Sequence, residues 1–249
     1  MSEDERSKYT EMERLSSEAY LLAKTKIQKP VPRSIQTRIE LKAICSIVEG
    51  LNELQKQAVI DIGFGGLLKL RCKHIDHEFY GWLLQKFDPT SRSLKIHGGE
   101  IILKVEDVHY LLGLQCRGSK VELATSTKGV EDICKEFGVK DKVVSLKVLK
   151  TYLSETNDAG IEFKRKFALY ILGAFLCPTT KAAIHERFIN LVKNVEVLNQ
   201  LNWAKFTLDF LVDGIYKWKG KKQKDAPGCL FLLMVYLYCL TCALIFSHL

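Results

Sequence analysis

Apolar residues recur every three or four positions along most of this chain. That spacing places them on one face of a helix and is typical of amphipathic helices that pack on a core. The chain is therefore predicted to be mainly α, a multi-helix globular domain. The segments with this spacing are 34–59 (with a break near Gly50), 74–87, 105–112, 130–137, 145–153, 161–176, 182–192 and 195–215.

One stretch alternates between apolar and polar residues instead. Two short strands flank Gly98-Gly99, and a two-residue glycine loop suits the positive φ angles of hairpin turns. The sequence therefore predicts one small β-hairpin over about 93–103, with Leu94 opposite Leu103. Because a lone hairpin is only marginally stable, its apolar face is expected to pack on helices. That face would carry Leu94, Ile96, Ile101 and Leu103.

The two ends of the chain differ in character. Residues 1–33 are charged and serine-rich and close on a Pro-Val-Pro break, so we expect a flexible arm or a frayed helix there, followed by one domain over 34–249. An apolar helix is predicted over 227–247, within a run, 226–247, that has no charged residue. Such a run is long enough to cross a bilayer of about 30 Å. A buried core helix and a tail anchor both stay open as interpretations.

Composition adds a basic charge balance to this picture. The chain has 249 residues, a formal net charge of +8 and 47% hydrophobic residues, which is enough to build a core in one large domain. A basic surface favours contact with nucleic acid or an anionic membrane. The clearest basic stretch is predicted to be a loop, 217–224, and the alternative is an ordinary solvated loop. The candidate phosphate or import-factor contacts in it are Lys217, Lys219, Lys221, Lys222 and Lys224.

Cysteines and histidines suggest two sites, and the sequence argues against both. Cys72, His74 and His77 have the spacing of metal ligands, but no second ligand pair accompanies them, so a buried thiol with two surface histidines is the preferred interpretation. Cys239 and Cys242 form a CxxC motif inside an uncharged apolar run, where burial raises a thiol pKa instead of lowering it. No metal site is predicted.

Two further motifs fail as catalytic or cofactor sites. The glycines of 63–66 lack the Lys-Ser/Thr of a phosphate-binding loop and read as a turn between helices. Cys177 ends an apolar segment before a proline, so pairing with His185 does not reproduce a cysteine-protease site. We therefore expect no catalytic residue and no cofactor. Without a visible signal peptide, the eight cysteines are expected to be reduced thiols in an intracellular protein.

A series of short motifs also runs along the chain in a definite order. In the first half they are Gly63-Phe64-Gly65, Leu67-Leu68, Trp82-Leu83-Leu84, Phe87-Asp88, Gly99, Glu106-Asp107-Val108, Leu112-Gly113-Leu114 and Gly118. In the second half they are FLCPTTK at 175–181, NWAKF at 202–206, LVDGI at 211–215 and GCL at 228–230. In order and spacing, over roughly 60–238, they resemble the plant mobile domain, also called the aminotransferase-like plant mobile domain. The residues expected to fix its architecture are Gly63, Gly65, Trp82, Phe87, Gly98, Gly99, Asp107, Gly113 and Trp203.

This resemblance implies a non-enzymatic nuclear domain of transposon origin. Relatives of this type are linked to transposon silencing, genome maintenance and meristem development, through protein or nucleic-acid contacts and without a small-molecule substrate. The chain departs from the family pattern at Lys104, where a threonine cap is usual, and at Gln115, where a proline is usual. The match ends near Tyr238, which suggests truncation at the C-terminus. A tail-anchored membrane protein with a helical cytosolic domain is the alternative.

Overall fold

The computed structural model describes residues 39–72, 77–96, 99–123, 129–140, 142–179, 181–221 and 226–246. The predicted arm at 1–33 lies outside this range, as do His74, Gly98, Lys222 and Lys224. Within it the protein is mainly α, as the apolar spacing predicts.

The chain alternates between full helices, short helical turns and two small sheets. The α-helices are α2 (Leu41–Gly50), α3 (Glu53–Asp61), α4 (His77–Lys86), α5 (Val105–Leu112), α6 (Glu131–Glu136), α7 (Leu146–Glu155), α8 (Ile161–Ile171), α9 (Ile189–Val192), α10 (Trp203–Lys221) and α11 (Leu230–Phe246). The short helical turns are the 3-10 segments η1 (Gly65–Lys69), η3 (Glu186–Phe188) and η4 (Val195–Gln200), and the π-helix η2 (Leu172–Leu176). The strands are β1 (Phe87–Asp88), β2 (Ser93–Ile96), β3 (Gly99–Ile102), β4 (Val143–Ser145) and β5 (Ala183–His185).

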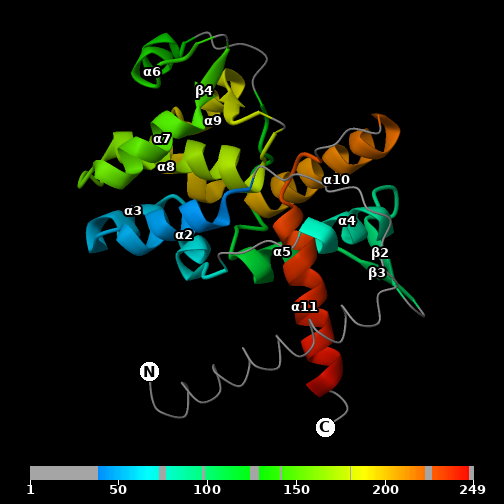
Figure 1. The fold of residues 1–249 in the computed structure, drawn as a ribbon. Coiled ribbons are helices and arrows are strands. Elements are labelled where there is room, and N and C mark those ends of the chain that lie inside the picture. The colour runs from blue at the N-terminus through cyan, green and yellow to red at the C-terminus, as the bar shows by residue number, and fades with distance from the viewer. Residues whose placement is uncertain are drawn as a thin grey trace, which may run out of the picture.

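These elements form two packed groups that share one core. In the first group α2 and α8 both pack on α7, and α3 packs on α8; in the second, α5 packs on α10 and α11, while α11 also contacts α4. Figure 1 shows the first group on one side of the molecule, and α4, β2 and β3 on the other. The central part of the core is α8 and η2, whose aromatic and aliphatic side chains from Phe167 to Leu176 are buried.

The chain after α5 runs beside η4 and the start of α10, and η4 also contacts α8 of the first group. We call this contact, Gln115–Ser119 against Asn199–Ala204, the central junction. Here the Ala204 amide donates to the Gln115 carbonyl at 3.0 Å, and the Asn202 side-chain amide donates to the Cys116 carbonyl at 2.7 Å. The indole of Trp203 is fully buried; its Nε1 donates to the Leu198 carbonyl at 2.7 Å. Trp203 therefore ties the start of α10 to the end of η4.

A glycine pair brings η1 against the end of α5. Gly113 caps α5 in the left-handed conformation, with φ of 63°. A Cβ at Gly66 would lie 2.5 Å from the Gly113 Cα, so the two backbones touch without side chains between them. At the other end of α5, Asp107 replaces the missing threonine cap in part: its carboxylate accepts the Lys104 amide at 2.7 Å.

The hairpin forms, but its predicted register and turn are wrong. Leu94 lies opposite Ile101 instead of Leu103, and Gly99 lies in β3, opposite Ile96, instead of in the turn. Because the pairing slides by two residues, each side chain keeps its face. Leu94 and Leu103 are buried, as expected, while β1 adds a third strand, paired with β2, that the sequence did not reveal.

Two predicted elements differ more strongly. The predicted helix at 182–192 begins instead as β5, which pairs with β4 in a second sheet, and becomes helical only from Glu186. Strand pairing wins here because Ile184 and Val144, opposite each other, are both buried. The predicted basic loop is also wrong in part, because α10 stays helical through Lys221.

The apolar C-terminal segment forms α11. Its first turns lie in the core, where Leu230, Leu232 and Leu233 are buried, as the core-helix interpretation expected. Farther along, the Tyr236 hydroxyl donates to the Ile102 carbonyl of β3 at 2.9 Å. In the part of the chain that the structure describes, no helix has both the length and the apolar character needed to cross a membrane.

The close contact of Gly66 with Gly113 predicts a stability difference between two glycines. Replacing Gly66 by alanine forces backbone apart and is expected to lower the free energy of unfolding by about 1–3 kcal/mol. Gly50→Ala is the matched control, because a Cβ there meets nothing within 4 Å. Urea denaturation of both variants checks this. An equal decrease in stability in the two variants would contradict the proposed contact.

Candidate functional site

A basic groove opens where the end of α4, the turn between β1 and β2, and the end of α10 meet. It encloses about 540 Å³ and is open to solvent along one side. Three of its lining residues are lysines, one is an aspartate and one is an exposed tyrosine. The lining residues are Gln85, Lys86, Phe87, Asp88, Pro89, Thr90, Lys95, Tyr216, Lys219 and Gly220.

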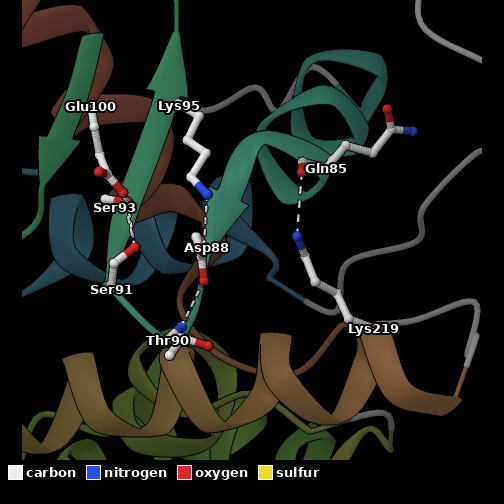
Figure 2. Close-up of polar contacts among 8 residues, drawn as sticks. All are labelled: Gln85, Asp88, Thr90, Ser91, Ser93, Lys95, Glu100 and Lys219. Atoms are coloured by element: carbon white, nitrogen blue, oxygen red, sulfur yellow. Dashed lines mark hydrogen bonds and ion pairs between the residues drawn. The ribbon is translucent and has the colours of Figure 1, made fainter.

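The local sequence explains how the floor of this groove forms. Phe87 is completely buried, and because side chains alternate along a strand, the next residue, Asp88, faces outward. Pro89 then starts the turn. The Asp88 carboxylate holds that turn by accepting the Thr90 amide at 2.9 Å, and it also binds the Lys95 ammonium group at 2.9 Å (Figure 2).

This ion pair sets the charge of the groove floor. The hydrogen bond from Lys95 is the largest cause that lowers the pKa of Asp88 to about 2, and the Thr90 amide adds to the effect. The same contact raises the pKa of Lys95. Both groups are thus charged at neutral pH and cancel locally, which leaves Lys86 and Lys219 as the uncompensated charges of the lining.

Lys219 bridges the two walls of the groove. Its ammonium group donates to the Gln85 carbonyl at 3.3 Å, close to the C-terminal end of α4, as Figure 2 shows. A cation is favourable there because the last carbonyls of a helix carry partial negative charge. Partial burial lowers the pKa of Lys219, and nearby Lys95 lowers it further, whereas Asp88 opposes the shift.

The other predicted lysines lie on the same helix end or beyond the described residues. Lys217 is exposed and paired with Asp213, one turn earlier in α10, at 2.5 Å. The backbone of Lys221 closes α10. The structure therefore brings Lys219 into the groove and leaves Lys217 beside it. It adds two lysines, Lys86 and Lys95, that the sequence did not single out.

A serine–glutamate cluster forms a rigid rim next to the groove. The Ser93 hydroxyl, which is buried, donates to the Glu100 carboxylate, and Ser91 donates to it at 3.0 Å (Figure 2). These hydrogen bonds, that from Ser93 first, lower the pKa of Glu100. They also join β2 to β3 across the hairpin. The cluster stabilises the strand that carries Lys95 and holds a fixed negative charge at its border.

The thiols and histidines considered for catalysis or metal binding are placed as follows. Cys177 is fully buried at the end of η2, and burial raises the pKa of its thiol well above the ordinary range, so it stays protonated. His185 is exposed and accepts the Arg187 amide at 3.2 Å. The Cys45 thiol contacts the carbonyl of Cys72 at 3.3 Å. Among the described residues no three His, Cys, Asp or Glu side chains gather as a metal site.

Comparison with known proteins gives a family and distant relatives. A family model described as a domain of unknown function (DUF8566) matches residues 37–234. Protein MAIN-LIKE 2 of Arabidopsis thaliana is 25% identical over 202 residues, which cover 76% of this chain and 30% of that protein. The serine/threonine-protein phosphatase 7 long form homolog of the same plant is 24% identical over 200 residues, 75% of this chain and 15% of that protein.

The chain thus spans less than a third of either curated relative. No solved structure matches it. The two plant relatives support the resemblance to plant mobile domain proteins in its broad form, at low sequence identity.

The ion pair between Asp88 and Lys95 leads to a prediction for the pKa of the Asp88 carboxylate. In the intact protein the Asp88 carboxylate should titrate near pH 2, against its ordinary value of 3.8. Since this pKa is lowered by folding, the pair stabilises the fold above the ordinary value and ceases to do so as pH falls toward 2. Lys95→Met should return the Asp88 pKa toward 3.8, as measured by carboxyl NMR titration.

Lys217→Met is the matched control for that titration. This variant also removes one lysine charge, but in the unmodified protein the Lys217 ammonium group pairs with Asp213 and not with Asp88. The Asp88 pKa should therefore stay low in this variant. An equal rise in both variants would mean that overall charge, and not the direct hydrogen bond, sets the Asp88 pKa.

Proposed function

This chain belongs to the family of the domain of unknown function DUF8566, and we propose that it is a non-enzymatic nuclear interaction domain of transposon origin that contacts nucleic acid through its basic groove. The similarity to plant proteins such as MAIN-LIKE 2, together with the ordered motifs of the plant mobile domain, supports the transposon origin. Transposon silencing, genome maintenance and meristem development are the processes in which such a domain would act.

The observation that carries this proposal is the composition of the groove. Lys86 and Lys219 offer ammonium groups without a carboxylate partner among the described residues, and Lys95 stands beside them on β2. Phosphate oxygens bind such groups, and the release of counterions from the nucleic acid favours the complex. The net charge of +8 adds long-range attraction.

An exposed aromatic ring supports contact with a single strand in particular. Tyr216 lines the groove with 65% of its surface exposed, although a large ring of this kind is usually covered. Bases stack on such rings regardless of sequence, which adds about 1–3 kcal/mol per base. Lysines next to an accessible ring are the combination found in sequence-tolerant single-strand binding.

A binding experiment tests this groove directly. Fluorescence anisotropy with a labelled single strand should show that Lys86→Gln/Lys219→Gln weakens binding and flattens its salt dependence. The log–log slope should fall by about 0.7 for each phosphate that the variant no longer neutralises. Tyr216→Ala should weaken single-strand binding by about 1–3 kcal/mol, because the ring no longer stacks on a base, and affect duplex binding less.

The control removes the same charge elsewhere. Lys120 and Lys135 are exposed and pair with neighbouring carboxylates, so Lys120→Gln/Lys135→Gln changes net charge equally without touching the groove. If both double variants weaken binding to the same extent, binding depends on overall charge, and the groove is not the site. Unchanged binding in both variants would place the contact outside the groove, and failure of the unmodified protein to bind the strand would overturn nucleic-acid contact itself.

Localisation is tested separately. A fluorescent protein fused at the N-terminus should accumulate in the nucleus of plant cells. Lys217→Gln/Lys219→Gln in the same fusion tests whether the end of α10 also contacts an import factor, which would appear as retention outside the nucleus. A reticular or mitochondrial pattern in the unmodified fusion would contradict the nuclear proposal and favour the tail-anchored alternative.

A further inference from the structure

A second cavity lies between α7, α8 and the start of α2. It encloses about 440 Å³, within the range of small-ligand pockets, and shares no lining residue with the basic groove. Its floor is apolar and small, and its rim is charged. The lining residues are Glu40, Leu146, Lys147, Lys150, Tyr170, Ala174 and Ala182.

Tyr170 is the unusual member of this lining. Only 1% of its surface is exposed, and among the described residues its hydroxyl has no hydrogen-bond partner. A buried hydroxyl without a partner costs about 1–3 kcal/mol, so such groups normally have one. Burial, followed by the nearby charge of Glu40, raises the pKa of Tyr170, so the hydroxyl keeps its proton at neutral pH and can donate it in a hydrogen bond.

The charges at the rim select the sign of a ligand. Lys150 is paired with Glu40 at 3.2 Å, so these two charges cancel. Lys147 has no ion pair within the described part of the chain. The lining therefore carries one uncompensated positive charge, which matches a single negative charge better than the double charge of a phosphate.

The backbone around the cavity makes room for a small apolar group. η2, which includes Ala174, is a π-helix, a rare conformation that occurs frequently at functional sites. In the same turn a Cβ at Gly173 would lie 2.8 Å from Leu146, so η2 packs closely on α7 beside the cavity. The alanine side chains at 174 and 182 leave the volume that larger residues would fill.

We propose that this cavity is a binding site for a small organic monocarboxylate, with the carboxylate held by the Tyr170 hydroxyl and the Lys147 ammonium group and a short apolar body resting on Leu146, Ala174 and Ala182. The ligand supplies the acceptor that Tyr170 lacks. It also balances the charge of Lys147. This site is independent of nucleic-acid binding at the groove.

An NMR titration of the whole chain with sodium propionate tests this site, with sodium chloride at matched ionic strength as reference. We expect saturable shifts at the amides of Leu146, Ala174 and Ala182. Tyr170→Phe should raise the dissociation constant for propionate about tenfold, equivalent to ~1.4 kcal/mol, because the variant loses one hydrogen bond to a charged group and keeps the ring. Without propionate, the Tyr170→Phe variant should be at least as thermally stable as the unmodified protein, because it lacks the unpaired buried hydroxyl.

Two further variants separate the site from a general charge effect. Lys147→Gln, at an exposed position on α7, should also weaken propionate binding, whereas Lys120→Gln should not. The proposal is overturned if propionate gives no saturable shifts, or if Tyr170→Phe binds it as tightly as the unmodified protein. Tighter binding of inorganic phosphate than of propionate would also overturn the assignment to a monocarboxylate.

Discussion

Burial of Trp203 at the central junction is the constraint on which the arrangement of the two helix groups depends. A buried indole must place its N–H on an acceptor, and Trp203 does so on the carbonyl of Leu198. That contact fixes the bend between η4 and α10. Phe64 packs on the same indole, with ring centroids 5.3 Å apart, so the turn after α3 is held against the start of α10 as well.

The position of the groove follows from this arrangement. Because α10 is fixed at its first residue, its far end projects over the strand β1 and the end of α4, and lysines on three separate elements come together there. Each of them has a structural contact or an ordinary surface position, so none interrupts the core. The chain thus builds a charged surface from residues that cost little stability, which is how a packed scaffold commonly carries its contacts.

Much of the helical fold can be predicted from the sequence, because the spacing of apolar residues indicates which face of a helix is buried. The helix at 105–112 lies where the spacing predicts, and the helix predicted at 145–153 forms at 146–155, since each depends on neighbours in sequence. Long-range pairing is different. The second sheet joins Val144 to Ile184, 40 positions later, and no local pattern reveals that contact. The hairpin shows how far a local pattern reaches. The alternation of apolar and polar residues predicted which side chains face inward, but it did not predict the strand register.

The candidate groove was predictable only in part for the same reason. The lysines near the end of α10 are evident as a basic stretch, whereas the sequence did not single out Lys95. Their meeting with Lys86 requires the three-dimensional path of the chain. Nothing in the sequence predicts the cavity around Tyr170, because a tyrosine in an apolar helix is expected to be an ordinary core residue. Its hydroxyl has no partner among the described residues, as is also true of Tyr80, but Tyr170 lines a cavity.

The contact between Tyr236 and β3 has a consequence for the behaviour of this protein in concentrated solution. β3 is the outer strand of its sheet, and an outer strand offers unpaired backbone groups to strands of other molecules. The hydroxyl of Tyr236 occupies the carbonyl of Ile102, a residue whose own side chain is largely exposed. Tyr236 therefore keeps one carbonyl of this outer strand from pairing with another molecule, and a chain without α11 would leave that carbonyl free.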